Sequence, residues 1–324
     1  MCTAVSFLSG DHYFGRNLDL EYALEEAVTI TPRNYPLYFA EARSLRSHYA
    51  FIGIATVAEG YPLYYDATNE AGLSMAALNF PGNAVYLPTT DGKDNIAPFE
   101  LIPWILGQCK TVAEAKALLE RINVINLPFS EKYPLTPLHW IIADRETAIV
   151  AEPVESGLVL YKNPVGVLTN NPPFPYHLQN LCNYLNLTAE EPENRFSLNL
   201  DLKPYSRGMG AFGLPGDLSS ASRFVRAAFV KSNSQCANTE NASVNQFFHI
   251  LESVAMQRGC VNISGNYEIT VYASCCNTTA GIYYYKTYEN SGLTAVSLFR
   301  EDLDGKHPVS YPLRTEPTVT YENH

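Results

Sequence analysis

Charged residues are scarce in this chain of 324 amino acids, and basic residues are scarcer than acidic ones. Only 17% of the residues are charged, and 22 Lys and Arg stand against 33 Asp and Glu, a formal net charge of -11. Nucleic acids and anionic membranes attract basic surfaces, so this balance argues against both as partners. Disordered chains have high charge and few aromatics, whereas 46% of these residues are apolar and 12% are aromatic. The composition is that of a globular protein.

Long apolar runs are also absent. The longest weakly polar run covers about residues 50–58, far short of the ~20 residues of a membrane helix. The segment before His12 contains neither a basic region nor a long apolar stretch, so it does not resemble a signal peptide. We therefore expect no membrane anchoring and a cytoplasmic location.

Cysteine is sparse, and its spacing is uninformative. The seven cysteines are odd in number and form no CxxC pair, which argues against a disulfide scaffold and against a zinc site. The adjacent Cys275 and Cys276 suggest a redox pair only weakly. Small buried thiols near the end of a strand are the simpler interpretation.

Most of the regular structure that the sequence predicts is β-strand. Apolar and β-branched runs bounded by Gly, Pro or Asn predict strands at 3–8, 27–31, 51–57, 73–78, 139–143, 148–152, 157–161, 165–169, 267–273, 281–288 and 293–298. The last three runs are separated by short turns and predict an antiparallel meander. No repeat or low-complexity linker divides the chain, so we expect one large domain over residues 1–324.

Helices are fewer and fall in two blocks. Thr111 and Glu114 form a capping-box pattern before a helix that extends to residue 122. Helical spacing of apolar residues predicts further helices at 99–106, 222–231 and 243–257. Because helices do not alternate with strands, the pattern favours an α+β fold with helices layered on mainly antiparallel sheets.

The first indication of chemistry is Cys2. Initiator methionine is removed when the next residue is small, so the mature chain is expected to begin at Cys2. That residue then carries a thiol of reference pKa ~8.5 and an α-amine of ~7.7–8.0, a nucleophile and its base in one residue. N-terminal nucleophile hydrolases use such a pair. A small second residue without any role is the plain alternative.

Residues 14–19, Phe14-Gly15-Arg16-Asn17-Leu18-Asp19, strengthen the catalytic interpretation. If the first strand returns as a hairpin, this segment lies beside the N-terminus. Arg16 would then hold a Cys2 thiolate, and Asp19 would accept from the α-ammonium. A surface Arg–Asp pair of little energetic value is the alternative.

Further motifs follow in order along nearly the whole chain. They are Asn69-Glu70-Ala71-Gly72-Leu73, Leu78-Asn79-Phe80-Pro81, Leu138-His139-Trp140, Val167-Leu168-Thr169-Asn170-Asn171-Pro172, Gly213-Leu214-Pro215-Gly216-Asp217, Ala221-Ser222-Arg223-Phe224 and Tyr283-Tyr284-Tyr285-Lys286-Thr287-Tyr288-Glu289. With Met1-Cys2-Thr3-Ala4 they resemble the choloylglycine hydrolase family of bile salt hydrolases and penicillin V acylases, most closely the bile salt hydrolases of Gram-positive gut bacteria. The resemblance implies a four-layer αββα N-terminal nucleophile hydrolase fold, a homotetramer, and neither metal nor organic cofactor.

The resemblance also implies roles for residues of this chain. Cys2 matches the nucleophile, Arg16 and Asp19 the pair beside it, Asn79 the oxyanion-hole side chain, Asn170 a second asparagine and Arg223 the active-site arginine. Penicillin V acylases commonly carry Tyr where this chain has Asn79, so Asn79 favours a bile salt hydrolase. The implied reaction is hydrolysis of glycine- and taurine-conjugated bile salts to free bile acid plus amine.

A steroid substrate requires an apolar slot. Candidate lining residues are Leu18, Leu20, Tyr22, Tyr61, Tyr64, Tyr65 and Phe80, with the loop around residues 85–87. We expect some of them to belong to the ordinary core instead. The polar, irregular stretch at 185–210 is expected to be an assembly or active-site loop.

Other interpretations stay open. A penicillin V acylase would use the same machinery with another acyl pocket. The glutamine-hydrolysing half of an amidotransferase also begins with Met-Cys, but usually continues with Gly, where this chain has Thr3. A non-catalytic protein that binds amphiphiles is the alternative of another class. His139 suits a hydrogen-bonded strand histidine better than the base of a further thiol, and residues 302–305 suit a turn better than a calcium loop.

Overall fold

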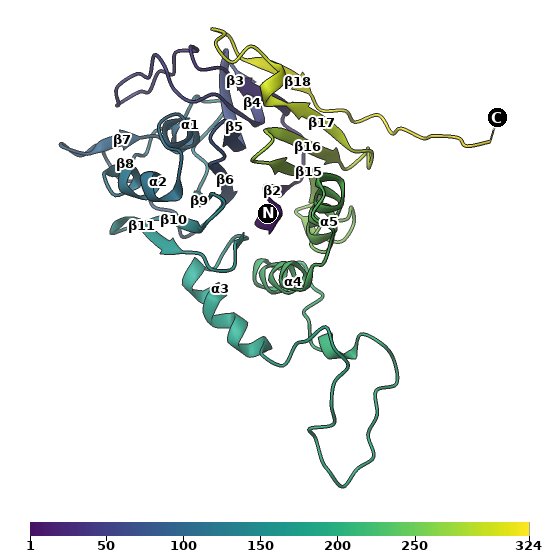
Figure 1. Cartoon of the computed structure of the whole chain (residues 1–324). Helices are drawn as coiled ribbons and strands as arrows, with labels where there is room; N and C mark the ends of the chain where they lie inside the picture. The colour runs from purple at the N-terminus through teal and green to yellow at the C-terminus, as the bar shows by residue number, and fades with distance from the viewer. Residues whose placement is uncertain (324) are drawn as a thin grey trace.

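The computed structural model describes residues 1–323, and two large antiparallel sheets dominate it (Figure 1). The six-stranded sheet has the order β12 (Val167–Leu168), β1 (Cys2–Ser9), β2 (Asp11–Leu20), β15 (Ile269–Asn277), β16 (Ile282–Thr287) and β17 (Thr294–Ser297). The eight-stranded sheet has the order β11 (Gly157–Lys162), β10 (Ala148–Val154), β9 (Leu138–Ala143), β6 (Ser74–Asn79), β5 (Tyr61–Asn69), β4 (Phe51–Ala58), β3 (Ala27–Thr31) and β18 (Val309–Pro312). Two small pairs add β7 (Asp94–Ile96) with β8 (Ile122–Val124), and β13 (Asn262–Ile263) with β14 (Asn266–Tyr267).

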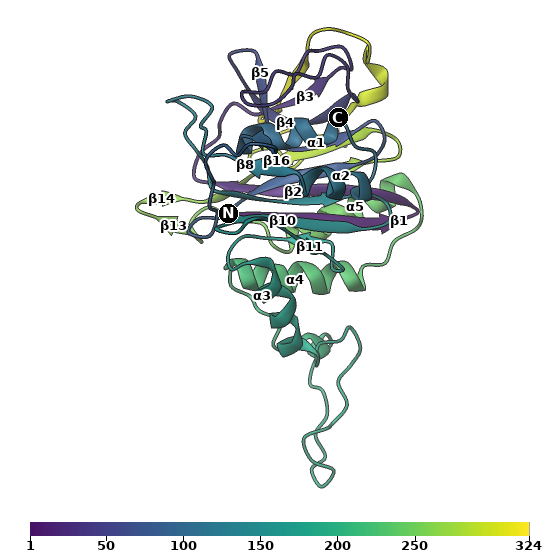
Figure 2. The same cartoon turned by 90° about the vertical axis from the view of Figure 1, so that its left-hand side faces the viewer.

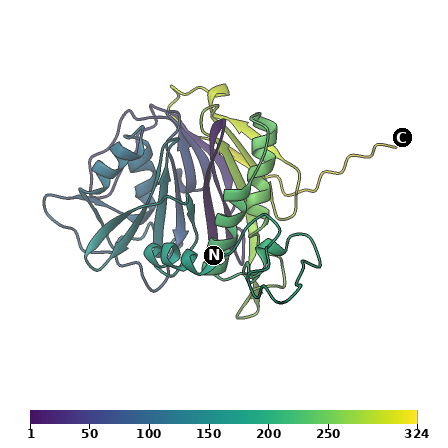
Figure 3. The same cartoon turned by 60° about the horizontal axis from the view of Figure 1, so that its bottom comes forward.

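Helices cover the outer face of each sheet, so the molecule has four layers (Figure 3). On the eight-stranded sheet lie α1 (Leu101–Leu106) and α2 (Val112–Leu119), and on the six-stranded sheet lie α4 (Ser220–Asn233) and α5 (Glu240–Glu252). The shorter α3 (Phe174–Asn180) contacts α4, and the 3₁₀ turns are η1 (Pro98–Glu100), η2 (Leu181–Tyr184), η3 (Met209–Ala211) and η4 (Leu298–Arg300). The predicted α+β class and αββα layering are confirmed.

Two apolar clusters hold these layers together. One fills the space between the sheets and continues under α4 and α5, with Phe14 and Phe247 among its buried members. The other lies between the eight-stranded sheet and α1 and α2, and contains Trp104 and Trp140. Burial of this apolar surface is the main favourable term for the four-layer stack.

The hairpin expected at the N-terminus is confirmed. β1 pairs with β2 so that Cys2 lies opposite Leu18 and Ala4 lies opposite Arg16. The turn uses Gly10, whose φ of 69° lies in the left-handed region that glycine adopts without strain. The hairpin therefore brings the segment 14–19 beside Cys2.

Most predicted elements are present, with ends shifted by a few residues. The strand expected at 165–169 shrinks to β12 (Val167–Leu168), and the helix expected to reach residue 122 ends at Leu119, beyond which β8 begins. Thr111 caps that helix by accepting from the Glu114 N–H at 3.2 Å. The Glu114 carboxylate reaches the Lys110 N–H at 2.7 Å instead of the cap residue's own amide. Half of the predicted capping box is therefore formed.

One segment projects from the layered body. Between η2 and η3 the chain forms a long loop that extends away from the sheets (Figure 2). We call residues 185–210 the arm. None of the helices within residues 1–323 combines the length and the apolar character needed to cross a bilayer.

Candidate active site

Cys2 opens strand β1 and is held by side chains from distant parts of the chain. It is 3% exposed. Its backbone N–H donates to Asn170 Oδ1 at 2.8 Å, and its carbonyl accepts from Arg223 Nη1 at 2.6 Å. Both backbone groups of the expected nucleophile are thus fixed.

Arg223, on the first turns of α4, connects three other expected site residues: Cys2, Asp19 and Asn170. Its guanidinium donates to Thr3 Oγ1 at 2.6 Å and to Asn170 Oδ1 at 2.8 Å, besides the Cys2 carbonyl. It also lies 3.9 Å from the Asp19 carboxylate. Burial lowers the pKa of Arg223, while the charge of Asp19 opposes this shift. Complete burial makes the planar fork of Arg223 a rigid anchor for its neighbours.

Asp19 acts on this cluster through Arg223. Its carboxylate accepts from Thr270 Oγ1 at 2.6 Å, and burial raises its pKa against the opposing effect of Arg223. The α-ammonium of Met1 donates to the Asp19 backbone carbonyl at 2.6 Å and pairs with the buried carboxylate of Glu268. With Met1 in place, the Asp19 side chain therefore contacts Arg223, whereas its position in the sequence predicted a contact with an α-ammonium.

Arg16 lies on β2 and faces the same space as Cys2. Its Nη1 donates to the Tyr65 carbonyl at 3.0 Å and to the Ala77 carbonyl, and its buried Nη2 has no partner within residues 1–323. Burial tends to lower the pKa of Arg16, but Cys2, Tyr272 and nearby carboxylates outweigh it, and the net shift is upward. A permanent cation beside a thiol favours the thiolate.

A buried carboxylate that sequence reasoning missed lies near Arg16. Asp66, on β5, accepts from the hydroxyls of Tyr272 at 2.7 Å and Ser274 at 3.4 Å, and from Tyr283. Burial raises the pKa of Asp66, and Arg16 leads the opposing contributions. No local pattern marks this aspartate, because its partners are about two hundred residues away in the sequence.

The two asparagines meet beside Cys2. Asn170 follows β12, and its Nδ2 donates to the carbonyl of Asn79 at 2.7 Å. Asn79 ends β6 and lines a cavity with Cys2 and Arg16. The fold thus gathers all six residues expected in the catalytic site.

The cavity has a volume of about 410 Å³. Such a volume is within the range of small-molecule sites. Of the residues expected to line it, five do: Leu18, Leu20, Tyr22, Tyr64 and Tyr65. Tyr61 and Phe80 are not among the lining residues. Tyr61 packs edge-on against Phe99, and Phe80 stacks on His139.

Much of the remaining wall comes from the loop between β8 and β9, which sequence reasoning missed. Its lining residues are Leu127, Pro128, Phe129, Lys132, Tyr133, Pro134, Leu135 and Thr136. The sequence feature that could have indicated this wall is a segment in which apolar and aromatic residues are interleaved with proline, without strand or helix periodicity. The expected loop around residues 85–87 supports this wall from outside the cavity, because the Tyr86 hydroxyl donates to the Thr136 carbonyl and accepts from the Leu138 N–H, both at 2.7 Å.

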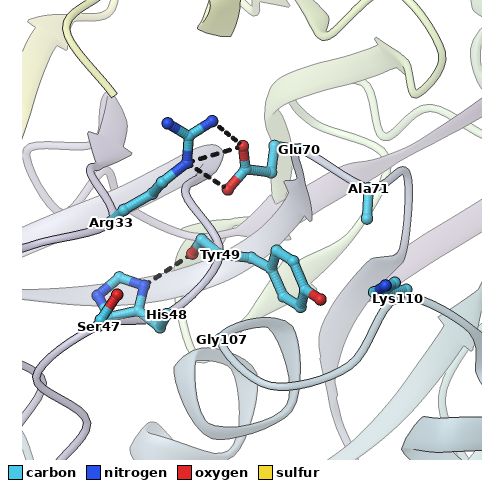
Figure 4. A pocket seen from close by; sticks show the side chains of 8 residues that line it. All are labelled: Arg33, Ser47, His48, Tyr49, Glu70, Ala71, Gly107 and Lys110. Atoms are coloured by element: carbon cyan, nitrogen blue, oxygen red, sulfur yellow. Dashed lines mark hydrogen bonds and ion pairs between the residues drawn. The ribbon is translucent and has the colours of Figure 1, made fainter. Parts of the chain in front are cut away.

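A second hollow, of about 630 Å³, lies elsewhere (Figure 4). Arg33 and Glu70 pair across it, at 3.0 and 3.1 Å from Nε to the two carboxylate oxygens, and His48 Nδ1 lies 2.7 Å from the Tyr49 carbonyl. Its charged pair, Arg33 and Glu70, is mutually satisfied, and we assign this hollow no chemistry. Within residues 1–323, no three His, Cys, Asp or Glu side chains are grouped as metal ligands would be.

Known proteins resemble this chain over nearly its whole length. The family described as linear amide C–N hydrolases, choloylglycine hydrolase family, matches residues 2–311. The bile salt hydrolase/transferase of Lactiplantibacillus plantarum is 56% identical over 317 residues, 98% of each chain, and that of Clostridium perfringens is 36% identical over 100% of each.

Solved structures agree with these matches. The crystal structure of a variant of the conjugated bile acid hydrolase from Clostridium perfringens has a TM-score of 0.92 and 35% identity, covering 99% of this chain and 100% of its own. The penicillin V acylase from Agrobacterium tumefaciens shares the fold, with a TM-score of 0.74 and 18% identity over 95% and 90% of the two chains. The chain that carries Cys2, Arg16 and Asn79 around one cavity therefore belongs to the choloylglycine hydrolase family of linear amide C–N hydrolases.

Proposed function

We propose that the protein hydrolyses the amide bond of glycine- and taurine-conjugated bile salts, with Cys2 as nucleophile. The observation that carries this proposal is that Cys2, Arg16 and Asn79 line one cavity with leucine and tyrosine side chains. The names of the relatives, bile salt hydrolase/transferase and conjugated bile acid hydrolase, support the substrate class.

The proposed reaction begins once Met1 has been removed. The free α-amine of Cys2 takes the proton of its own thiol, and the thiolate attacks the amide carbonyl carbon of the substrate. Arg16 stabilises the thiolate. Asn170 Oδ1, which accepts from the Cys2 nitrogen in this structure, orients the amine.

A tetrahedral intermediate follows, and its negatively charged oxygen lies beside Asn79. The Asn79 side-chain amide and a backbone N–H donate to this oxygen, where charge develops. The α-ammonium then gives its proton to the leaving nitrogen, the C–N bond breaks, and glycine or taurine departs. A thioester to Cys2 remains. Water, deprotonated by the same amine, attacks the thioester and releases the bile acid.

Burial of a rigid apolar acyl group in the cavity explains substrate binding better than electrostatic attraction to the whole protein. The chain carries a net charge of -11, so its overall field repels an anionic bile salt. Burial of the steroid against leucine and tyrosine side chains therefore supplies most of the affinity, at about 25 cal/mol per Å² of apolar surface. Arg16 and Lys132 are the cationic side chains of the wall within residues 1–323.

A second candidate activity is acyl transfer from the same thioester. Both relatives compared above are named bile salt hydrolase/transferase. An amine that replaces water as the attacking group would form a new amide and regenerate the Cys2 thiol. The partition between water and amine would then depend on the free amine concentration.

We further propose that the protein is a homotetramer located in the cytoplasm. The resemblance of the motifs to the family supports the tetramer. Light scattering and cell fractionation test these two points.

The function is tested by amine release from glycocholate, taurocholate and penicillin V, with untagged protein and Cys2→Ala in parallel. Release from the bile salts that depends on Cys2 supports the proposal. Release mainly from penicillin V would keep the mechanism and replace the substrate class. If neither protein releases an amine but both bind bile salts equally, the chain is a binding protein and the proposal fails.

A further inference from the structure

A buried pair of ionisable side chains lies outside the cavity but against the segments that carry both asparagines. His139 on β9 and Glu152 on β10 have fully buried side chains, and His139 Nδ1 lies 3.1 Å from Glu152 Oε1. Neither residue lines the cavity. Burial of such a pair costs free energy unless its hydrogen bonds are well made, so its partners are informative.

The pair connects two sheet strands to the chain around Asn170. The other ring nitrogen of His139, Nε2, donates to the Thr169 carbonyl at 2.9 Å, and Glu152 Oε1 also accepts from the Phe174 N–H at 2.9 Å. Both ring nitrogens of His139 are therefore engaged in hydrogen bonds. Together with Glu152, the imidazole anchors both ends of the segment 169–174.

The same imidazole also contacts the segment that carries Asn79. The ring of Phe80 stacks on that of His139, with centroids 4.3 Å apart and planes 6° from parallel. Strand pairing places His139 opposite Leu78. The imidazole therefore contacts the residue after Asn79 and the residue before Asn170.

The remaining backbone groups of Asn170 are held in a similar way. Its N–H donates to Ser220 Oγ at 2.8 Å, and its carbonyl accepts from His177 Nε2 at 2.9 Å. The Asn170 side chain is therefore left to serve the Cys2 nitrogen, Arg223 and the Asn79 carbonyl. The orientation of its amide depends on this buried frame.

We propose that His139 and Glu152 are positioning residues for the reaction: they hold Asn79 and Asn170 in register with Cys2. The inference rests on the proposed function and adds two residues that never touch the substrate. Catalysis is sensitive to such placement, since a displacement of about 1 Å can cost about 10²-fold in rate.

The test compares His139→Gln and Glu152→Gln with a matched control, His12→Gln. His12 is also a buried histidine, hydrogen-bonded to Ser6 Oγ at 2.9 Å and Thr278 Oγ1 at 3.0 Å, but lies at the other end of β2 from Leu18. We call His139→Gln and Glu152→Gln the frame variants. For both of them we expect kcat on glycocholate to fall about 10²-fold. KM should change little, because neither side chain lines the cavity. His12→Gln should keep the wild-type kcat.

The folded fraction is measured for each variant by circular dichroism and urea unfolding, and rates are expressed per folded molecule. Should His139→Gln not fold, Glu152→Gln carries the test, because glutamine keeps the size of the side chain but replaces the carboxylate that faces His139 Nδ1. A kcat within about twofold of wild type in the folded variants, a loss confined to KM, or an equal loss in His12→Gln would overturn the proposal.

A readout independent of the substrate separates this inference from the proposed function. The rate of Cys2 alkylation by iodoacetamide reports the reactivity of the thiol that Asn170 and Arg223 surround. We expect slower alkylation in both frame variants and an unchanged rate in His12→Gln. If wild-type protein releases no amine from any bile salt, the proposed function fails, and an unchanged alkylation rate in the frame variants would refute the positioning role separately.

Discussion

Asn79 is the side chain on which stabilisation of the transition state depends in the proposed mechanism. It lines the cavity with Cys2, and its own carbonyl is fixed by Asn170. A donor placed where negative charge develops contributes to the transition state and little to substrate binding.

We therefore predict that Asn79→Ala lowers kcat by about 10²–10³-fold with little change in KM. Steady-state amine release from glycocholate measures both constants. Asn83→Ala, a nearby asparagine that does not line the cavity, serves as the control and should behave as wild type. A loss that appears wholly in KM would show that Asn79 binds the substrate and does not stabilise the intermediate.

At the scale of residues, what the sequence predicts depends on how far apart the partners are. Cys2 and Arg16 are joined by a single hairpin, so pattern and register place them together. Asn79, Asn170 and Arg223 converge from separate elements, and only the resemblance of their motifs identified them. Asp66 and the lining residues at 127–136 carry no such motif, because their role follows from contacts with remote strands.

Gly15 shows how tightly the strands that carry the site are packed. A Cβ built on Gly15 would lie 1.9 Å from the Ser274 carbonyl oxygen and 2.5 Å from its carbon. These atoms are backbone of β15, so the two strands would have to separate.

We predict that Gly15→Ala lowers the free energy of unfolding by roughly 3 kcal/mol, at the upper end for overpacking. It should also reduce activity, because the Arg16 N–H donates to Ser274 Oγ at 3.1 Å. Urea unfolding monitored by circular dichroism measures the first effect. Gly216→Ala, where nothing lies within 4 Å of the added Cβ, should leave stability nearly unchanged. Equal stability of wild type and Gly15→Ala would contradict the close packing of β2 and β15.

His12, at the start of β2, makes the free energy of unfolding depend on pH. Burial lowers the pKa of His12 from 6.5 to about 4. Between these two values the unfolded chain binds the proton and the folded chain does not. Stability is therefore lost as the pH falls from 6.5 toward 4, by roughly 3 kcal/mol from this group.

We predict that His12→Gln removes this part of the dependence of stability on pH. Urea midpoints of both proteins between pH 7 and pH 4 give the comparison, and the difference between them isolates His12 from the carboxylates that also titrate there. Parallel curves for the two proteins would show that His12 does not contribute.

Strand β5 (Tyr61–Asn69) is an element that the sequence pattern did not predict. It contains Pro62 near its start and the buried Asp66, two residues that are depleted in strands. Pro62 fits because it sits near the beginning of the strand, and Asp66 fits because distant hydroxyls donate to it. Neither condition is visible in the local pattern. The strands β15, β16 and β17 were predictable because each run is joined to the next by a short turn.

At the scale of the whole molecule, the site exists because two sheets meet. The six-stranded sheet supplies Cys2, Arg16 and Asp19, and the eight-stranded sheet supplies Asn79. The family resemblance implied the four layers, whereas no local periodicity in the sequence predicts the order of the strands within each sheet.

The arm is the most exposed apolar segment that the layers do not cover. Phe196 is 84% exposed and Leu198 is 97% exposed. Apolar groups of this size on a projecting loop mark an interaction surface. We predict that the double variant Phe196→Ser and Leu198→Ser forms smaller assemblies than the proposed tetramer.

Size-exclusion chromatography with light scattering gives the mass of each protein. Leu8→Ser, an exposed leucine outside the arm, serves as the control and should keep the wild-type mass. A wild-type monomer would refute the tetramer, and an unchanged mass in the double variant would exclude the arm from the interface.

The proposed mechanism requires Cys2 to act through both its thiol and its own α-amine. The most direct measurement is amine release from glycocholate by a chain with a removable extension ahead of Cys2, before and after a protease exposes Cys2 as the first residue. Intact mass defines the N-terminus in each sample. We predict no release while Cys2 is internal and release at the wild-type rate once its amine is free. Full turnover with Cys2 internal would contradict the mechanism.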